Sequence, residues 1–146
     1  MKGIVGKIRI YPEKRAAGFE LMEARLIEGH GLEGDCHAQG GERQISILFA
    51  ESREMITSAK EKGLCFPRFN ENITIEGMSS SQFAPGTRLY AGDAILEISS
   101  ETKRCHKECG LYKNYEDGKN CPLAGINLFA KVVKGGLIRA GARISL

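Results

Sequence analysis

The 146-residue chain has no uninterrupted apolar run long enough to cross a bilayer. Its first ten residues also lack the apolar stretch of a signal peptide, because Lys2, Lys7 and Arg9 interrupt them. We therefore expect neither a transmembrane helix nor a classical secretion signal. We also expect a cytoplasmic protein that does not associate with membranes.

The sequence has little excess of charge of either sign. It has 21 lysines and arginines and 18 aspartates and glutamates, which gives a formal net charge of +3. The two signs are interspersed along the chain. A nucleic-acid partner is not expected from this balance, although a small anionic ligand is compatible with it. The sequence shows no internal repeat or low-complexity linker, and 42% hydrophobic residues are enough for one core. We expect a single domain over residues 1–146.

Cysteine is the exception to this plain composition, with five residues in the chain. An odd number without a secretory signal favours thiols, metal ligands or catalysts over a disulfide framework. Cys105, Cys109 and Cys121 lie within one segment, and Lys103, Arg104, His106 and Lys107 surround the first of them. Nearby positive charge favours the thiolate, which attacks electrophiles and binds metals. The segment therefore predicts sulfur chemistry or a metal site, with loop cysteines of no special task as the alternative.

Alternating apolar and polar residues predict short strands along most of the chain. The strongest examples are 4–11 and 45–49, where one face of each strand would be buried. Further strands are expected at residues 22–28, 69–77, 87–90, 94–99, 127–133 and 137–146. The polar link between the strands at 4–11 and 22–28 is expected to be a hairpin loop. The pattern predicts a mostly β protein with a closed antiparallel barrel.

One main helix is expected at about residues 50–62. Glu51 and Glu54 lie near its start, and Lys60 and Lys62 lie near its end, so that both ends complement the helix dipole. Gly63 suits the position after the last helical residue.

A glycine-rich segment, residues 29–41, is expected to form a loop, because five of its thirteen residues are glycine. Asp35 and His37 are two residues apart and would point the same way from an extended backbone. They are candidates for a binding site. The alternative is an aspartate that caps a turn beside a solvated histidine.

Four motifs in order give the chain a resemblance to a known family. They are Gly31–His37, Arg43–Ile47, Phe69–Ile73 and Gly92–Ile98, the last followed by Cys105 eight residues after Glu97. Together they resemble the MOSC domain, the C-terminal part of molybdenum cofactor sulfurases, from about Gly3 to Leu146. The tail resembles the small stand-alone bacterial type encoded beside molybdopterin-biosynthesis proteins.

The resemblance implies a β-barrel in which Cys105 carries sulfur or ligates molybdenum. It further implies a site for molybdenum cofactor (molybdopterin), bound transiently, at Asp35, His37, Arg43, Asn70, Glu71, Asn72 and Arg104. The chain departs from the family pattern in two ways. The last strand has Gly141-Ala142 where the family often has Gly-Asp, and Cys109 and Cys121 are additional cysteines that we include among the catalytic candidates.

Three functions are consistent with these residues. In the first, the protein is a sulfurtransferase-like carrier: a pyridoxal-phosphate-dependent cysteine desulfurase transfers sulfane sulfur to Cys105, and the persulfide delivers it to molybdenum cofactor or another metal-sulfur centre. The chain has no room for a pyridoxal-phosphate domain of its own, so the desulfurase would be a partner, as would proteins of molybdenum cofactor or molybdoenzyme biosynthesis. Cys109 or Cys121 could resolve the persulfide as a disulfide.

In the second function, the protein binds molybdenum cofactor as a carrier or reductase component. Cys105 would be the metal ligand, since a soft thiolate suits a thiophilic metal, and Arg43, Arg68, Lys103 and Arg104 would hold the phosphate. In the third, the cysteines with His106 or His37 would hold structural zinc or an iron-sulfur cluster. Zinc usually takes two closely spaced ligand pairs, and here one pair is accompanied by a lone cysteine. The sequence ranks the three in this order.

Overall fold

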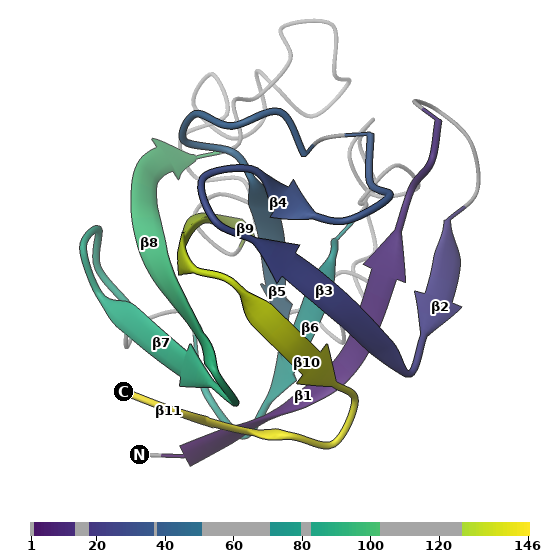
Figure 1. Ribbon diagram of the computed structural model, residues 1–146. Coiled ribbons are helices and arrows are strands. Elements are labelled where there is room, and N and C mark those ends of the chain that lie inside the picture. The colour runs from purple at the N-terminus through teal and green to yellow at the C-terminus, as the bar shows by residue number, and fades with distance from the viewer. Residues whose placement is uncertain (1, 14–17, 37, 51–70, 80–82, 103–126) are drawn as a thin grey trace, which may run out of the picture.

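Seven strands form a closed barrel in the computed structural model, which describes residues 2–13, 18–36, 38–50, 71–79, 83–102 and 127–146 (Figure 1). Around the ring they follow the order β11-β7-β8-β9-β5-β6-β1, and pairing of β1 with β11 closes it. Their bounds are β1 Lys2–Ile10, β5 Ile45–Phe49, β6 Ile73–Glu76, β7 Arg88–Ala91, β8 Ala94–Thr102, β9 Asn127–Lys134 and β11 Arg143–Ser145. The predicted mostly β fold with a closed barrel is confirmed.

A smaller sheet of three strands packs against the barrel (Figure 1). It has the order β10-β3-β4, and the strands are β3 (Glu23–Ile27), β4 (Gly31–Leu32) and β10 (Gly136–Arg139). Leu26, Leu32 and Ile138 from this sheet join the same apolar cluster as the barrel interior. Gly135 allows the close approach, because a Cβ at this residue would lie 2.7 Å from the carbonyl oxygen of Leu26.

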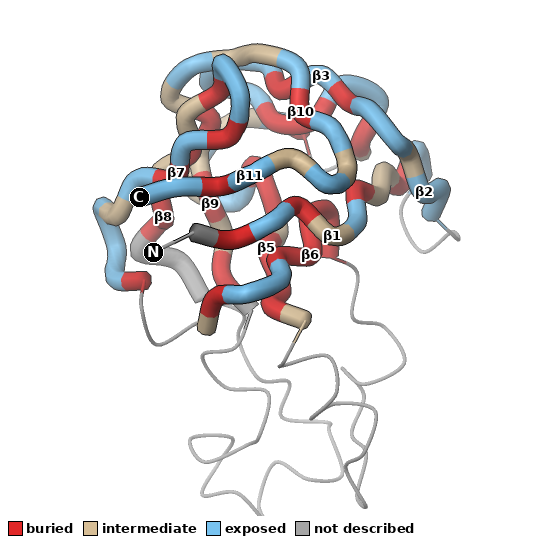
Figure 2. The backbone as a smooth tube through the Cα atoms, turned by 90° about the horizontal axis from the view of Figure 1, so that it is seen from below, coloured by how far each residue is buried: buried red, intermediate tan, exposed pale blue. Residues whose placement is uncertain are grey.

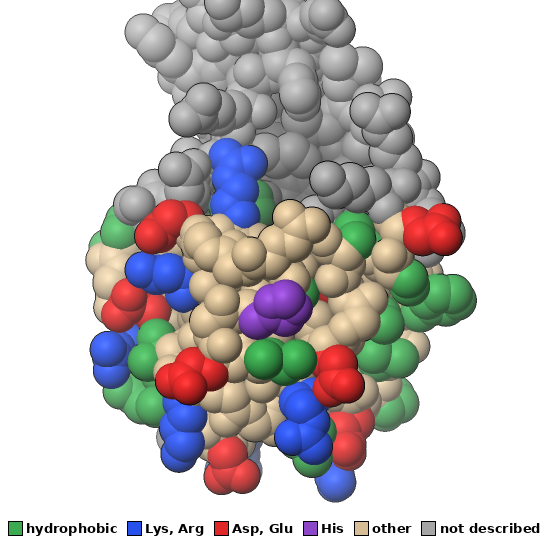
Figure 3. All heavy atoms as spheres, turned by 45° about the horizontal axis from the view of Figure 1, so that its top comes forward, with side chains coloured by type: hydrophobic (Ala, Val, Ile, Leu, Met, Phe, Trp, Pro, Cys, Tyr) green, Lys and Arg blue, Asp and Glu red, His purple; other side chains and the backbone are tan. Residues whose placement is uncertain are grey.

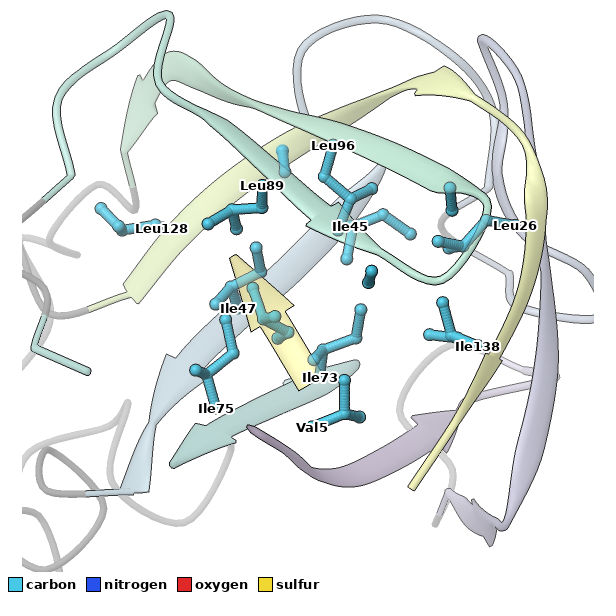
Figure 4. Packing of buried hydrophobic residues seen from close by; sticks show 14 of the residues in the cluster. Val5, Leu26, Ile45, Ile47, Ile73, Ile75, Leu89, Leu96, Leu128 and Ile138 are labelled. Atoms are coloured by element: carbon cyan, nitrogen blue, oxygen red, sulfur yellow. The ribbon is translucent and has the colours of Figure 1, made fainter. Parts of the chain in front are cut away.

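The core lies inside the barrel and takes side chains from every strand of the ring (Figure 4). Ile45, Ile47 and Phe49 are fully buried on one face of β5, as their alternation predicted. Leu48, on the other face, is fully buried as well. Burying one such side chain stabilises the fold by about 1.5–3 kcal/mol. Figure 2 shows buried residues along the strands and exposed residues concentrated at turns and on the small sheet.

Two details of strand pairing differ from the prediction. β5 and β6 pair in parallel, so the barrel is not wholly antiparallel. A parallel pair needs a long crossover, and residues 50–72 supply it. The hairpin partner of β1 is the short strand β2 (Phe19–Leu21), whereas the predicted second strand, now β3, belongs to the small sheet.

The buried face of β1 also differs from simple alternation. Ile4 is exposed, whereas Val5 and Ile8, three residues apart, are both buried. The pairing with β6 shifts between Val5 and Lys7, which is the mark of a β-bulge with one extra residue. A bulge moves all following side chains to the opposite face.

The predicted helix at residues 50–62 is not borne out. All of it except Ala50, which is helical, lies outside the described residues, and every element with bounds inside the described ranges is a strand. Within those ranges, no helix combines the length and the hydropathy needed to cross a membrane.

Candidate functional site

Four of the predicted site residues lie in the described part of the chain: Asp35, Arg43, Glu71 and Asn72. The others lie outside it and remain predictions: His37, Asn70, Arg104, Cys105, Cys109 and Cys121. The predicted proximity of Asp35 and His37 to Cys105 is therefore not tested by the structure. The surroundings of the four described residues decide what each one can do.

Asp35 is buried and connects the glycine-rich loop to the end of β1. Its Oδ1 accepts a hydrogen bond of 2.8 Å from the backbone N–H of Tyr11. The carbonyl oxygen of Tyr11 accepts in return from the N–H of Cys36 at 2.8 Å. The two bonds hold the loop against residue 11. At least one carboxylate oxygen of Asp35 is therefore used to hold the backbone and not to bind a ligand.

Replacing Asp35 with alanine should lower the free energy of unfolding by about 1–3 kcal/mol, because the buried N–H of Tyr11 loses its acceptor. Asp35→Asn retains an oxygen at Oδ1 and should recover most of this loss. Urea unfolding of each variant measures the difference. Glu33→Ala is the matched control, since Glu33 lies in the same loop in an exposed ion pair with Arg25 that contributes little. Equal losses for the alanine and asparagine variants would show that the charge of Asp35 matters rather than the acceptor.

Asn72 lies immediately before β6. It bonds to β5 and to β1, the strands on either side of β6 in the sheet. Its Oδ1 accepts from the N–H of Ser46 on β5 at 2.9 Å, and its Nδ2 donates to the carbonyl oxygen of Arg9 on β1 at 3.2 Å. Its backbone bonds the same two residues: the N–H donates to Ser46 and the carbonyl oxygen accepts from Arg9. The side chain thus bonds a backbone group on each side instead of pointing to solvent.

Glu71 is buried beside Asn72, and its carboxylate has two polar neighbours. Oε1 lies 3.9 Å from the guanidinium of Arg9 and accepts from the hydroxyl of Thr74 at 3.5 Å. Its carbonyl oxygen accepts from the phenol of Tyr11 at 3.1 Å. Arg9 is half-buried, so this ion pair is partly shielded from water. Glu71 and Asn72 therefore form one packed polar cluster with Tyr11, Arg9 and Thr74.

Arg43 differs from the other three because it is exposed. Its guanidinium carbon lies 4.9 Å from the ring centre of Phe129 on β9, a cation–π arrangement. The ring contacts the flat face of the guanidinium and not its N–H groups. Arg43 is thus the described site residue best suited to bind an anion.

The end of β8 lies close to this arginine along the sheet. Thr102, the last residue of β8, pairs with Leu128, and the neighbouring Phe129 pairs with Ser46. The guanidinium of Arg43 therefore lies over β9, one residue along from Leu128, which pairs with the end of β8. In the sequence, Cys105 follows Thr102 by three residues.

Sequence reasoning missed several polar residues that build this region. Buried Gln44 accepts from the N–H of Val132 and donates to the carbonyl oxygen of Gly41, both at 2.9 Å, which ties the glycine-rich segment to β9. Buried Ser99 donates to Glu42 at 2.9 Å. The sequence predicted Tyr11 only as the last residue of a strand. Its position directly before Pro12, at the end of an alternating run, is the feature that could have singled it out.

Charges on the adjacent face do not gather by sign. Figure 3 shows lysines, arginines, aspartates and glutamates scattered around a centre of backbone, uncharged side chains and a histidine on the described part of the face turned forward. Ion pairs within the described residues include Lys131 with Glu42 at 3.5 Å and with Glu97 at 3.6 Å. Among the residues that the structure describes, no three His, Cys, Asp or Glu side chains are grouped so that they could hold a metal ion.

Comparison with protein families assigns this chain to one family. The family model described as the MOSC domain matches residues 34–145. The chain belongs to the MOSC domain family. Residues 34–145 include the loop with Asp35, the strand after Arg43, the Glu71–Asn72 pair and Cys105.

Relatives of this MOSC chain include proteins named YiiM and YuaD. Protein YiiM of Escherichia coli strain K12 is 25% identical over 113 residues, which is 70% of this chain and 50% of YiiM. The chain thus spans about half the length of this curated relative. The YuaD protein of Bacillus subtilis has a similar structure, with a TM-score of 0.74 and 20% identity over 99% of this chain and 94% of YuaD. YiiM of Geobacillus stearothermophilus gives a TM-score of 0.68 at 16% identity, over 99% of this chain and 74% of that one.

Proposed function

We propose that this MOSC chain is a sulfur carrier that accepts sulfane sulfur as a persulfide on Cys105. The donor is a cysteine desulfurase, which forms its own persulfide with pyridoxal phosphate. The acceptor is molybdenum cofactor or another metal-sulfur centre. The reaction belongs in the cytoplasm, where thiols are kept reduced.

The first step is a thiol exchange. The Cys105 thiolate attacks the outer sulfur of the donor's persulfide, the donor's S–S bond breaks, and the donor cysteine leaves as a thiolate. Cys105 then carries the sulfane sulfur. In the second step, the thiolate of Cys109 or Cys121 attacks the inner sulfur of this persulfide. A disulfide forms, and the outer sulfur leaves as hydrosulfide, so that two cysteine sulfurs are oxidised and the sulfane sulfur is reduced.

The position of Arg43 is the observation that carries the proposal. Its exposed guanidinium lies over Phe129, and Leu128, the next residue on β9, pairs with Thr102 at the end of β8. The three residues from Thr102 to Cys105 can span about 10 Å at most. An arginine near the end of β8 would favour an anion there, which supports the proposed thiolate and an anionic acceptor. Lys103, Arg104 and Lys107 add positive charge next to Cys105 in the sequence.

The described residues fit molybdenum cofactor only at its phosphate end. Arg43 has donors for a phosphate, whereas Asn72 bonds backbone groups on both sides, and Asp35 holds the backbone N–H of Tyr11. The buried carboxylate of Glu71 is shared by Arg9 and Thr74. We therefore treat the cofactor as the acceptor that receives sulfur. Stable binding of the cofactor is the second candidate function, and the exposed Arg43 favours it.

Intact mass and metal content of protein purified without reductant would test the proposal. A sulfur carrier should gain the mass of one sulfur atom after incubation with a cysteine desulfurase and cysteine, and dithiothreitol should remove it. A stable cofactor carrier should instead contain pterin and molybdenum in equal amounts. Stoichiometric zinc or iron without added sulfur would overturn the proposal and favour a structural metal module.

A further inference from the structure

Strand β2 (Phe19–Leu21) is an edge strand within the described part of the chain. It pairs with β1 on one side, and none of the described strands pairs with it on the other. Figure 1 shows it at the outer margin of the barrel, next to β1. The main-chain groups of an edge strand can pair with a strand from another chain. The main-chain groups and side chains at this edge decide which strand would fit.

The hydrogen bonds of β1 show which main-chain groups of β2 point outward. Arg9 lies directly opposite Glu20, yet both main-chain groups of Arg9 bond Asn72 on the other side of β1. Its N–H donates to the carbonyl oxygen of Asn72 at 2.7 Å, and its carbonyl oxygen accepts from Nδ2 of Asn72 at 3.2 Å. Opposite residues of an antiparallel pair that do not bond each other turn their main-chain groups away from one another. The N–H and the carbonyl oxygen of Glu20 therefore point to the open edge.

The apolar face of β2 continues past the core into solvent. Leu21 and Ile10 lie on this face and pack against the core. Phe19, directly opposite Ile10, is 61% exposed, and Met22, which follows β2, is 74% exposed. These two are the most exposed large apolar side chains among the described residues. A strand added beside β2 would lie against Phe19 and remove apolar surface from water, which favours the addition.

The charge on the other face of β2 distinguishes between two occupants. Arg9, opposite Glu20, is paired with Glu71 at 3.9 Å. Among the described residues, neither Arg9 nor Lys7, the other cation on this face of β1, forms an ion pair with Glu20. A second copy of this chain that overlapped β2 fully would place two Glu20 side chains opposite one another, and like charges in that position are destabilising. A lysine or arginine opposite Glu20 would instead form a favourable cross-strand pair.

We propose that β2 is a docking edge for an extended segment of another protein, which adds to it as an antiparallel strand. The segment has a lysine or arginine opposite Glu20 and apolar residues opposite Phe19 and Leu21. The outward N–H and carbonyl oxygen of Glu20 bond its main chain, and its alternating side chains provide the specificity. The proposal does not depend on sulfur transfer.

Nuclear magnetic resonance of the isotope-labelled full-length chain tests this edge, with the peptide acetyl-Thr-Val-Lys-Val-Thr-amide as the probe. The amide proton of Glu20 should move downfield and saturate as peptide is added, because its N–H gains an acceptor. Replacing the lysine of the peptide with glutamate should raise the half-saturating concentration about two- to fivefold, and Glu20→Lys should reverse this preference. Glu28→Lys makes the same change of charge at an exposed residue between β3 and β4, so it is the matched control and should keep the wild-type preference.

Three results would overturn the proposal. An unchanged amide signal of Glu20 at the highest peptide concentration would show that the edge does not accept a strand. A reversed preference in Glu28→Lys would show that the peptide is attracted by net charge and does not pair at Glu20. Concentration-dependent dimerisation of the chain in sedimentation equilibrium, lost in Phe19→Ser, would assign the edge to a second copy of the chain.

Discussion

Replacing Cys105 with serine should abolish uptake of labelled sulfur from a cysteine desulfurase. A serine hydroxyl does not form the thiolate that attacks the donor persulfide, so the expected loss is at least about a hundredfold and is limited by the background of the assay. Label from radioactive cysteine, counted on the isolated protein before and after reduction, measures the uptake. Cys36→Ser and Cys65→Ser are the matched controls and should accept label at the wild-type rate.

The two other cysteines of the segment should behave differently from Cys105. Cys109→Ser or Cys121→Ser should leave the first transfer intact and slow the release of sulfide, because the resolving thiolate is then missing. Cys109 follows Glu108, whose negative charge disfavours a thiolate, whereas three cations lie within two residues of Cys105. Normal uptake by Cys105→Ser together with no uptake by Cys109→Ser would transfer the nucleophile's role to Cys109.

The strands of the barrel were largely predictable because their signal is local. Ile45, Ile47 and Phe49 are buried on one face of β5, as their alternation predicted, although Leu48 on the other face is buried too. The buried face of β1 was not predicted, since the bulge near Gly6 adds one residue and reverses the alternation halfway along the strand. An alternating sequence gives no sign of where a bulge occurs.

Strand partners were less predictable than the strands themselves. The parallel pairing of β5 with β6 depends on where the chain returns after a long crossover, and the sequences of the two strands do not encode that direction. The same holds for β3, which leaves the barrel for the small sheet although it follows β2 after a single residue. Both arrangements depend on contacts between segments that are far apart in the sequence.

The sequence named candidate site residues, but it could not assign the tasks of the polar ones. An aspartate or an asparagine in a family motif suits a ligand as well as a backbone hydrogen bond, because both tasks need the same oxygen and nitrogen atoms. Asp35 and Asn72 proved to bond main-chain groups far away in the sequence. Only the distances in the fold distinguish an anchor of the backbone from a group that faces a ligand.

Asn72→Ala should lower the free energy of unfolding by about 2–4 kcal/mol. The substitution leaves the N–H of Ser46 and the carbonyl oxygen of Arg9 without the partners that the amide supplies. A fully buried group that loses its partner costs about 1–3 kcal/mol, and these two bonds are part-buried. Urea unfolding should show a lower midpoint with an unchanged slope, since the barrel still folds. Ser145→Ala, on the exposed side of β11, is the control and should change the value by less than about 0.5 kcal/mol.

Asn72→Asp separates the anchoring task from ligand binding. Aspartate keeps an acceptor for the N–H of Ser46 but has no donor for the carbonyl oxygen of Arg9, and it places a negative charge against that oxygen. We therefore expect Asn72→Asp to be no more stable than Asn72→Ala, even though it nearly preserves the shape of the side chain. The loss should be the same in protein free of any cofactor, because both bonds lie within the chain. Wild-type stability in both variants would show that the amide does not hold β5 and β1 together, and Asn72 would return to the set of candidate ligands.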